Sequence, residues 1–146
     1  MEINGLKLPS AFVQDLQRGH LHRQRGSWEL KKNESAYDEP LETELSHVFE
    51  SLSRIQKETD ELPEGYTSLS VEDVAGYTDA CGIQVGEISY IWDFSHIVCF
   101  AVAGDGAPFC FDYREDPQEP RVIWWADAYW QRVAPNYTLF IQLFDC

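Results

Sequence analysis

Residues 91–113 hold the side chains that could carry out acid–base, nucleophilic or anion-binding chemistry in this chain. The candidates, in chain order, are Asp93, His96, Asp105, Cys110 and Asp112. A histidine that shares a strand face with a carboxylate and an arginine could act as a tuned base or help to bind an anion. We favour a simpler interpretation, in which Asp112 and Arg114, two residues apart, form an ordinary charge pair.

The spacing of other polar residues argues against metal, nucleophilic and nucleotide sites. His20 and His22 lie two apart in a polar segment, and no HExxH or CxxC pattern accompanies them. The pair Ser95-His96 lacks the glycines of a nucleophile elbow. The Gly-Asp-Gly tripeptide at 104–106 precedes an apolar strand rather than the helix that a phosphate-binding loop requires. We therefore expect no metal, no nucleotide and no other cofactor.

A β-hairpin is expected to position the residues of this stretch. Two apolar runs, 97–103 and 109–113, are joined by the Gly-Asp-Gly tripeptide at 104–106. Glycine tolerates positive φ angles, and an aspartate can accept a hydrogen bond from the backbone two residues on. The tripeptide therefore predicts a tight turn between two antiparallel strands.

Pairing centred on the turn fixes which side chains of the hairpin share a face. It places Cys99 opposite Phe111, and therefore on the other face from Cys110. It also brings His96 and Asp112 onto one face. The two thiols stand in apolar runs without CxxC spacing, so we expect them to be reduced, buried and structural.

An apolar stripe predicts the clearest helix of the chain. Its members, most of them three or four residues apart, are Leu41, Leu45, Val48, Phe49, Leu52 and Ile55. Asp38 and Glu39 precede the stripe, as acidic residues often do at the start of a helix. We expect truncation of Leu52 to alanine to cost about 2–5 kcal/mol if this side chain is fully buried.

The other predicted elements alternate between strands and short helices. They are a helix within 8–19, strands at 27–31, 88–92 and 121–125, a helical turn at 70–75 and a last helix after Pro135. Short turns between the strands of 88–113 favour antiparallel pairing over β-α-β crossovers. The sequence therefore predicts an α+β fold, a mainly antiparallel sheet flanked by helices, in one domain over residues 1–146.

The net charge of −14 is concentrated in the later part of the chain. Residues 1–57 hold eight basic and nine acidic side chains, whereas residues 58–146 hold three and sixteen. Such a surface repels the backbone of a nucleic acid and steers a basic partner inward, so we expect no direct contact with nucleic acid. An acidic surface that serves only solubility explains the same charge, and we give the two interpretations equal weight.

Two features bear on where the protein is found. No segment approaches the ~20 consecutive apolar residues needed to span a bilayer. The N-terminal residues MEING have neither the basic start nor the apolar run of a signal peptide. We expect a cytoplasmic protein that does not contact a membrane.

Four aromatic residues cluster late in the chain: Trp124, Trp125, Tyr129 and Trp130. Neighbouring strand residues point to opposite faces, so either Trp124 or Trp125 is expected to point outward. An outward tryptophan is a typical anchor of a protein interface. For any one of these residues, a place in a large aromatic core is the interpretation we favour.

Several pieces of the chain occur in the order and spacing of one protein family. They are Leu8-Pro9 with Phe12 and Leu16, Asp93-Phe94 with Ile97, FAVAGDG at 100–106, FCFDYR at 109–114, RVIWW at 121–125, and WQRVA at 130–134 leading to Phe140-Ile141. With these pieces the chain resembles the SUKH superfamily, which includes bacterial immunity proteins and yeast Smi/Knr-type regulators of cell-wall assembly. The resemblance implies an α+β fold, no shared catalytic chemistry and, for bacterial members, neutralisation of a toxin by stoichiometric binding.

We therefore expect a non-enzymatic immunity protein whose partner is a basic bacterial toxin domain such as a nuclease. Its expected contacts combine acidic groups for steering with an aromatic anchor, and they are Asp93, Asp105, Asp112, Glu115, Asp116, Trp125 and Asp127. Two alternatives stay open. One is a regulatory adaptor like the eukaryotic members, and the other is a small-ligand domain with a pocket around Asp93, His96 and Asp112. The sequence does not set the oligomeric state.

Overall fold

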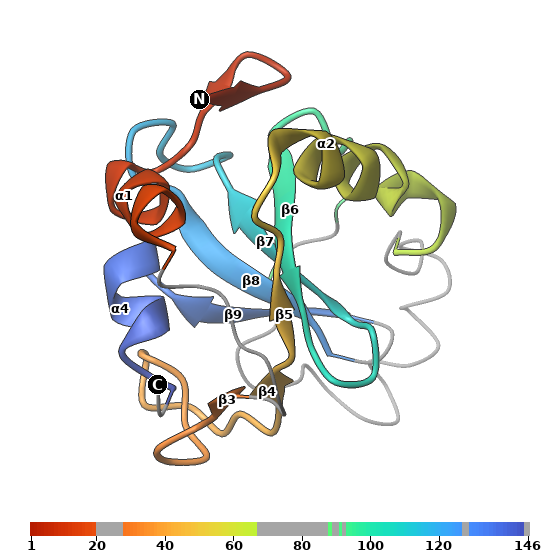
Figure 1. Ribbon diagram of the computed structural model, residues 1–146. Coiled ribbons are helices and arrows are strands. Elements are labelled where there is room, and N and C mark those ends of the chain that lie inside the picture. The colour runs from red at the N-terminus through yellow and green to blue at the C-terminus, as the bar shows by residue number, and fades with distance from the viewer. Residues whose placement is uncertain (20–27, 67–87, 89–90, 92, 127–128, 145–146) are drawn as a thin grey trace, which may run out of the picture.

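An antiparallel sheet of five strands forms the centre of the computed structural model, which describes residues 1–19, 28–66, 88, 91, 93–126 and 129–144. The strands lie in the order β5-β6-β7-β8-β9 (Figure 1). Their bounds are His47–Val48 for β5, Ile97–Val102 for β6, Pro108–Asp112 for β7, Arg121–Trp125 for β8 and Trp130–Ala134 for β9. Every neighbouring pair is antiparallel, which is the pairing that short connections favour.

Helices and two small ribbons accompany this sheet. The helices are α1 (Ser10–Arg18), α2 (Leu52–Asp60) and α4 (Tyr137–Ile141), and a 3₁₀ turn, η1 (Leu62–Glu64), follows α2. The ribbons pair β1 (Glu2–Ile3) with β2 (Leu6–Lys7), and β3 (Trp28–Glu29) with β4 (Glu44–Leu45). The predicted α+β class with a mainly antiparallel sheet is confirmed.

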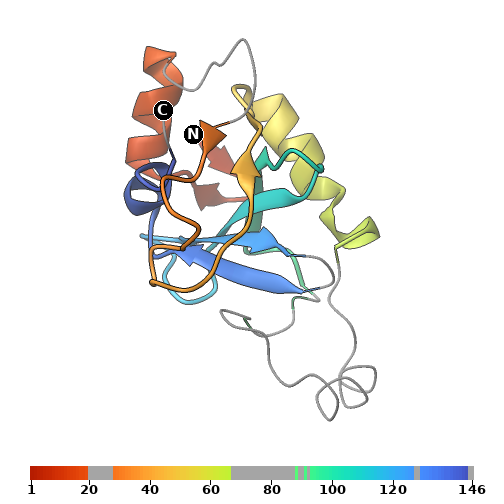
Figure 2. The ribbon, with the colours of Figure 1, turned by 90° about the horizontal axis from the view of Figure 1, so that it is seen from below.

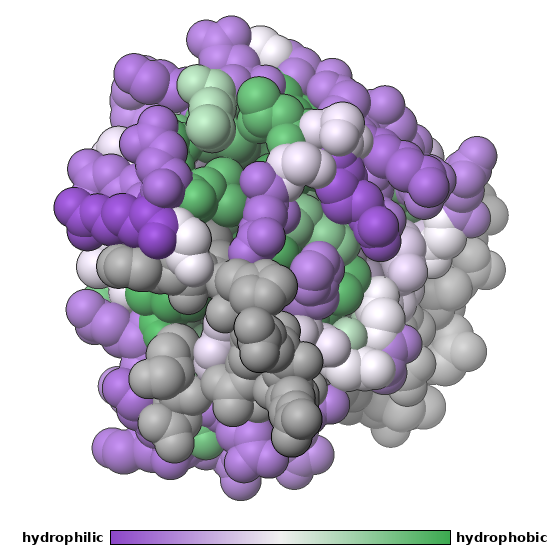
Figure 3. Space-filling model, in the orientation of Figure 1, coloured by the Kyte–Doolittle hydropathy of each residue, from purple (hydrophilic) through white to green (hydrophobic). Residues whose placement is uncertain are grey.

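Helices α1 and α4 lie side by side against one face of the sheet (Figures 1 and 2). Aromatic rings fill this contact. The ring of Phe12 on α1 meets the rings of Phe100 and Phe111 edge-on, with centroids 5.5 and 5.3 Å apart, an arrangement that aromatic pairs favour. Helix α2 lies along β6 instead, and hydrophobic side chains show at the surface between α1 and α2 (Figure 3).

Local sequence signals explain where α1 ends and where α4 begins. Gly19 terminates α1 in the left-handed conformation, with a φ of 69° that glycine tolerates. The side chain of Asn136 caps α4, because it accepts a hydrogen bond from the N–H of Leu139 at 2.8 Å. The helices predicted within 8–19 and after Pro135 are both confirmed.

The helix predicted from the stripe at 41–55 is wrong over most of its length. Helix α2 begins only at Leu52, and Ser51 caps it by accepting a hydrogen bond from the N–H of Arg54. Upstream of α2, Val48 lies in β5, the edge strand of the sheet, and pairs with Ala101 of β6. The upstream members of the stripe are buried nonetheless: Leu41, Leu45, Val48 and Phe49. Leu52 itself is 40% exposed, so the expectation that it is central in a buried stripe is wrong as well.

The hairpin predicted between 97 and 113 is confirmed, with its turn at 104–106. The carboxylate of Asp105 accepts a hydrogen bond from the N–H of Ala107 at 3.0 Å, and Gly106 adopts a φ of 90°. Next to the turn the expected register holds, since Ala101 lies opposite Phe109.

A β-bulge between Cys99 and Ala101 shifts the rest of the hairpin by one residue. Cys99 therefore lies opposite Cys110 rather than Phe111, and the prediction that the two thiols occupy opposite faces is wrong. Both cysteines are buried and neither forms a disulfide. Burial raises the pKa of the Cys110 thiol, which makes it a poor nucleophile.

Helix α2 provides a hydrogen-bond acceptor beside the bulge. The N–H of Cys99 donates to the side-chain oxygen of Thr59, which is buried on α2, at 3.0 Å. A buried backbone donor without an acceptor would destabilise the fold, so this bond ties the helix to the bulged strand.

Strand predictions elsewhere agree with the structure in part. Strand β8 occupies 121–125 as predicted, and β3 lies within 27–31. Strand β9 was not predicted, because the polar pair Gln131-Arg132 interrupts the apolar alternation between Trp130 and Val133. The helical turn predicted at 70–75 lies outside the described residues, as does most of the strand predicted at 88–92.

Candidate functional site

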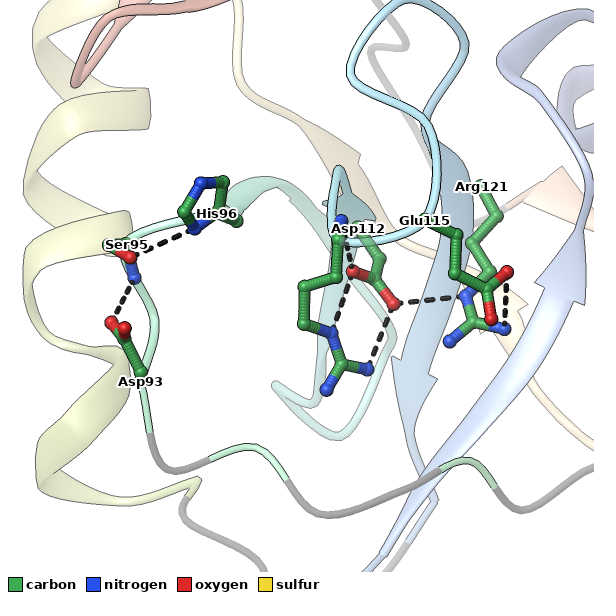
Figure 4. Close-up of polar contacts among 7 residues, drawn as sticks. Asp93, Ser95, His96, Asp112, Glu115 and Arg121 are labelled. Atoms are coloured by element: carbon green, nitrogen blue, oxygen red, sulfur yellow. Dashed lines mark hydrogen bonds and ion pairs between the residues drawn. The ribbon is translucent and has the colours of Figure 1, made fainter.

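Asp112 is a fully buried carboxylate held between two arginines at the end of β7 (Figure 4). Its Oδ1 accepts hydrogen bonds from the Nε and the backbone N–H of Arg114, at 2.9 and 3.0 Å. Its Oδ2 accepts from the Nη2 of Arg114 at 3.0 Å and from the Nε of Arg121 at 2.9 Å. Burial by itself raises the pKa of Asp112, but the bonds and charges of the two arginines outweigh burial and lower that pKa. The predicted charge pair with Arg114 is confirmed, and Arg121 completes it.

The residues expected to surround a small-ligand pocket do not come together. The Nδ1 of His96 lies 3.0 Å from the Oγ of Ser95, whose N–H donates to the carboxylate of Asp93 at 2.9 Å. Figure 4 shows these residues as a group apart from Asp112. The bulge changes the register, so that Ile97 rather than Val98 lies opposite Asp112, and His96 lies in the turn that precedes β6. The ligand-binding alternative thereby loses its expected geometry.

The acidic residues expected to contact a partner lie at two ends of the hairpin. Asp93, Glu115 and Asp116 are exposed at the end where β6 begins and β7 finishes. Asp105 is exposed in the turn at the opposite end. Six residues of extended β6 separate the two ends by about 20 Å. The carboxylates therefore form no single patch.

The other three expected contacts differ from one another in accessibility. Asp112 is buried, so it is out of reach of a partner in this conformation. Trp125 is half-buried, with its ring centroid 5.3 Å from that of Trp130, whereas its neighbour Trp124 is buried on the opposite face. Asp127 lies outside the described residues. Of the two adjacent tryptophans, Trp125 is the more accessible.

Sequence reasoning missed a second ion pair, which lies on β9. The Nε and Nη2 of Arg132 donate to the two carboxylate oxygens of Glu39 at 2.7 and 3.0 Å, and the guanidinium lies 4.4 Å from the ring centroid of Tyr37. The hydrogen bond from Arg132 lowers the pKa of Glu39 by more than burial raises it. The partners are 93 residues apart in the chain, so no local pattern could have paired them.

Sequence reasoning also missed an acidic cavity of about 420 Å³ beside the turn at 104–106. We call it the Glu44 cavity. Its carboxylates belong to Glu29, Glu42, Glu44 and Asp105. The other lining residues are Leu30, Asn33, Thr43, Ala103, Gly104 and Trp124. No lysine, arginine or histidine of the described ranges lines this cavity.

The same structure gives no sign of a metal centre or a membrane span in the ranges it describes. Within these ranges, no three His, Cys, Asp or Glu side chains are grouped so that they could hold a metal ion. None of the described helices is long and apolar enough to cross a bilayer.

Of three comparisons with known proteins, one found a match, and it agrees with the architecture. A search among curated proteins and a search among solved structures found no match. The model of one protein family matches residues 3–143, which is nearly the whole chain. Its description also agrees with the resemblance that the hairpin and the flanking motifs indicate. The chain therefore belongs to the SMI1 / KNR4 family (SUKH-1).

Proposed function

We propose that this protein is a non-enzymatic immunity protein that neutralises a cognate bacterial toxin by binding it directly. The observation that carries the proposal is membership of the SMI1 / KNR4 family (SUKH-1), since the SUKH superfamily includes bacterial immunity proteins. The net charge of −14 favours a basic toxin domain, such as a nuclease, as the partner.

The environment of the candidate catalytic groups supports a binding role over an enzymatic one. Asp112 is neutralised by two arginines and buried, so it is a structural anion rather than an accessible base. The imidazole of His96 bonds its neighbour Ser95 and does not face Asp112. Cys110 is buried with a raised pKa. These groups do not converge on a shared reacting atom, as a catalytic site requires.

Three exposed carboxylates, Asp93, Glu115 and Asp116, form what we call the acidic rim. Glu115 pairs with the Nη1 of Arg121 at 3.5 Å, but its side chain is 72% exposed, so it is accessible to a partner. The Oδ1 of Asp116 accepts hydrogen bonds from the backbone of its own turn, at 2.8 and 3.2 Å, and is thereby fixed in position. Charges on a rim raise the association rate of a basic partner.

An apolar anchor is also needed to slow dissociation, and Trp125 lies at the other end of the sheet, near the hairpin turn. Trp125 is half-buried and packs its ring against Trp130, so the accessible part of the indole is held in one orientation. A rigid aromatic surface costs little conformational entropy when it is covered. The proposed contacts are therefore the acidic rim at one end of the hairpin and, at the far end, Trp125 and Asp105.

A growth-protection assay tests the proposal. A candidate toxin domain, sought among the genes next to the one for this protein, is expressed in a bacterial host with and without this protein. We expect full protection by the wild-type chain. We expect protection to weaken when the rim is reversed by Glu115→Lys with Asp116→Lys, because association then lacks steering. The matched control is Glu61→Lys with Glu64→Lys, which makes the same charge change at two exposed residues of the η1 region.

The variants distinguish a failure of the proposed function from a failure of the proposed binding surface. If the wild-type chain gives no protection although both proteins are folded, the pairing with that toxin is wrong. If protection survives the rim reversal and also survives Trp125→Ala in folded proteins, the surface assignment is wrong while the immunity function stands.

A further inference from the structure

We infer that Cys99 and Cys110 are a modification site, at which a hydroperoxide such as hydrogen peroxide converts the two thiols into a reversible disulfide across the hairpin. The inference goes beyond the proposed function and does not depend on it. Three observations support it: the register of β6 and β7, the backbone hydrogen bonds around the two cysteines, and a cavity beside Cys99.

The bulge in β6 brings the two cysteines directly opposite each other on neighbouring strands (Figure 1). Pairs in an antiparallel ladder alternate between hydrogen-bonded and non-hydrogen-bonded ones. The N–H of Tyr113 donates to the carbonyl of His96 at 2.9 Å, so these residues form a hydrogen-bonded pair. Three steps along the ladder, Cys99 and Cys110 are therefore a non-hydrogen-bonded pair. The N–H of Cys99 agrees with this, because it donates to Thr59 of α2 and not to β7.

A non-hydrogen-bonded pair has the geometry that a disulfide needs. Its Cα atoms lie about 4.5 Å apart, which is within the range of about 4.4–6.8 Å that a disulfide spans. Side chains of directly opposite residues also leave the sheet on the same face. Burial raises the pKa of the Cys110 thiol, and a hydrogen bond with the thiol of Cys99 raises it further, so the two thiols are in contact. The disulfide can therefore form without a change of register.

A cavity of about 320 Å³ beside the pair gives a small oxidant room to approach. Its lining includes Cys99 and Tyr66. Burial raises the pKa of the Tyr66 phenol, and the charges of ionised Cys99 and Cys110 raise it further, so this phenol lies near both thiols. Cys99 is 2% exposed and lines the cavity, whereas Cys110 is 0% exposed and does not. Cys99 is therefore the residue of the pair that the oxidant reaches first.

The reaction takes two steps and consumes one molecule of hydrogen peroxide. The thiolate of Cys99 attacks one oxygen, the O–O bond breaks, and Cys99 becomes a sulfenic acid while the released hydroxide takes up a proton as water. The sulfur of Cys110 then attacks the sulfur of Cys99, the S–O bond breaks, and the second hydroxide leaves with the Cys110 proton as water. The two thiols thereby lose two electrons and two protons, which the peroxide accepts. Contact between the thiols offsets the weak nucleophilicity of Cys110.

Mass spectrometry on the full chain tests the inference. The folded protein is treated with hydrogen peroxide, its remaining thiols are blocked by alkylation, and it is digested with a protease that cleaves after aspartate. Cleavage after Asp105 separates the two cysteines, so their disulfide links two peptides that a thiol reductant then releases. We expect these linked peptides to be the main oxidised product. No linked peptides, or peptides that join either residue to Cys81 or Cys146 instead, would overturn the inference.

Two variants assign the roles of the cysteines. In Cys110→Ala the sulfenic acid of Cys99 has no thiol to resolve it, so we expect dimedone, added together with denaturant after the peroxide, to label Cys99. In Cys99→Ala we expect at least severalfold less label on Cys110, because this thiol is fully buried and its pKa is raised. Equal or stronger labelling of Cys110 would overturn the assignment of Cys99 as the attacking thiol. If either variant does not fold, the linked peptides of the wild type still decide the inference.

Urea unfolding of the reduced and the oxidised wild type tests whether the native hairpin accepts the bond. The disulfide closes the loop from 99 to 110 in the unfolded chain, so we expect the urea midpoint to rise by about 1 M on oxidation. Addition of a thiol reductant should return the midpoint to its original value. A midpoint that falls on oxidation would show that the bond distorts the folded hairpin, and the inference would be wrong.

Discussion

Replacing Asp112 with asparagine should be among the most destabilising changes of similar size in this protein. The carboxylate is fully buried and accepts four hydrogen bonds, three from Arg114 and one from Arg121. An asparagine has one acceptor oxygen, so its NH₂ group would face guanidinium donors. Breaking a buried pair by removing one partner costs about 3–5 kcal/mol. The side chains of Arg114 and Arg121 are 25% and 15% exposed, so water can solvate them in part and we expect a loss of about 3 kcal/mol.

Denaturant unfolding of wild type and Asp112→Asn measures this loss directly, provided that the free energy of unfolding depends equally steeply on denaturant concentration in both proteins. The control is Glu58→Gln, which removes the carboxylate from a pair with Arg54 whose guanidinium side chain is 53% exposed. An exposed pair of this spacing contributes less than about 0.5 kcal/mol. If Asp112→Asn costs no more than Glu58→Gln, the buried cluster does not hold the end of the sheet together and the reasoning is refuted.

The pH dependence of the stability difference between wild type and Asp112→Asn follows from the direction in which the fold shifts the pKa of Asp112. The folded-state pKa of Asp112 is lowered, because the arginine bonds outweigh the opposing effect of burial. Because this pKa is lowered in the folded state, the ionised carboxylate of Asp112 contributes its full stabilisation above the ordinary pKa of 3.8. That stabilisation is lost as the pH falls through the lower pKa of the folded state. The stability difference between wild type and Asp112→Asn should therefore stay constant down to that region and shrink below it. A stability difference that grows on acidification would contradict the conclusion that the fold stabilises the ionised form of Asp112.

Three further predictions concern stability, and each is checked by the same unfolding measurement. Leu52→Ala should cost less than about 1 kcal/mol because this side chain is 40% exposed, whereas Ile55→Ala on the same helix should cost about 2–5 kcal/mol. Thr59→Val should cost about 1–3 kcal/mol because the buried N–H of Cys99 loses its acceptor, and Thr59→Ser should restore most of the loss. Asn136→Ala removes the cap of α4 and should cost about 1 kcal/mol; no measurable loss would show that this short helix is held by packing alone.

Features governed by neighbouring residues could be predicted from the sequence. The turn at 104–106, the end of α1 at Gly19 and the charge pair of Asp112 with Arg114 each depend on residues only a few positions apart. Their causes are the conformational freedom of glycine and the short reach between residues on one strand face. The structure confirms all three.

Features that depend on distant partners could not be predicted in this way. The stripe at 41–55 has helical spacing, yet Val48 within it pairs with Ala101 of β6, some fifty residues later in the chain. The bulge in β6 has no marker in the sequence, and the single-residue shift that it causes changed which side chains face Asp112.

The same limit applies to the candidate site. Glu39 and Arg132 meet across 93 residues, and the Glu44 cavity joins β4 to the hairpin turn. The family resemblance could place motifs in order along the chain, but it could not give these contacts.

The central claim, that this protein works by binding a basic toxin, is tested most directly by titration calorimetry. The full chain is titrated with the candidate toxin domain of the growth-protection assay, at low and at high salt. The account predicts tight one-to-one binding that weakens as salt screens the acidic surface. Absence of binding at low salt, with both proteins shown to be folded, would contradict it.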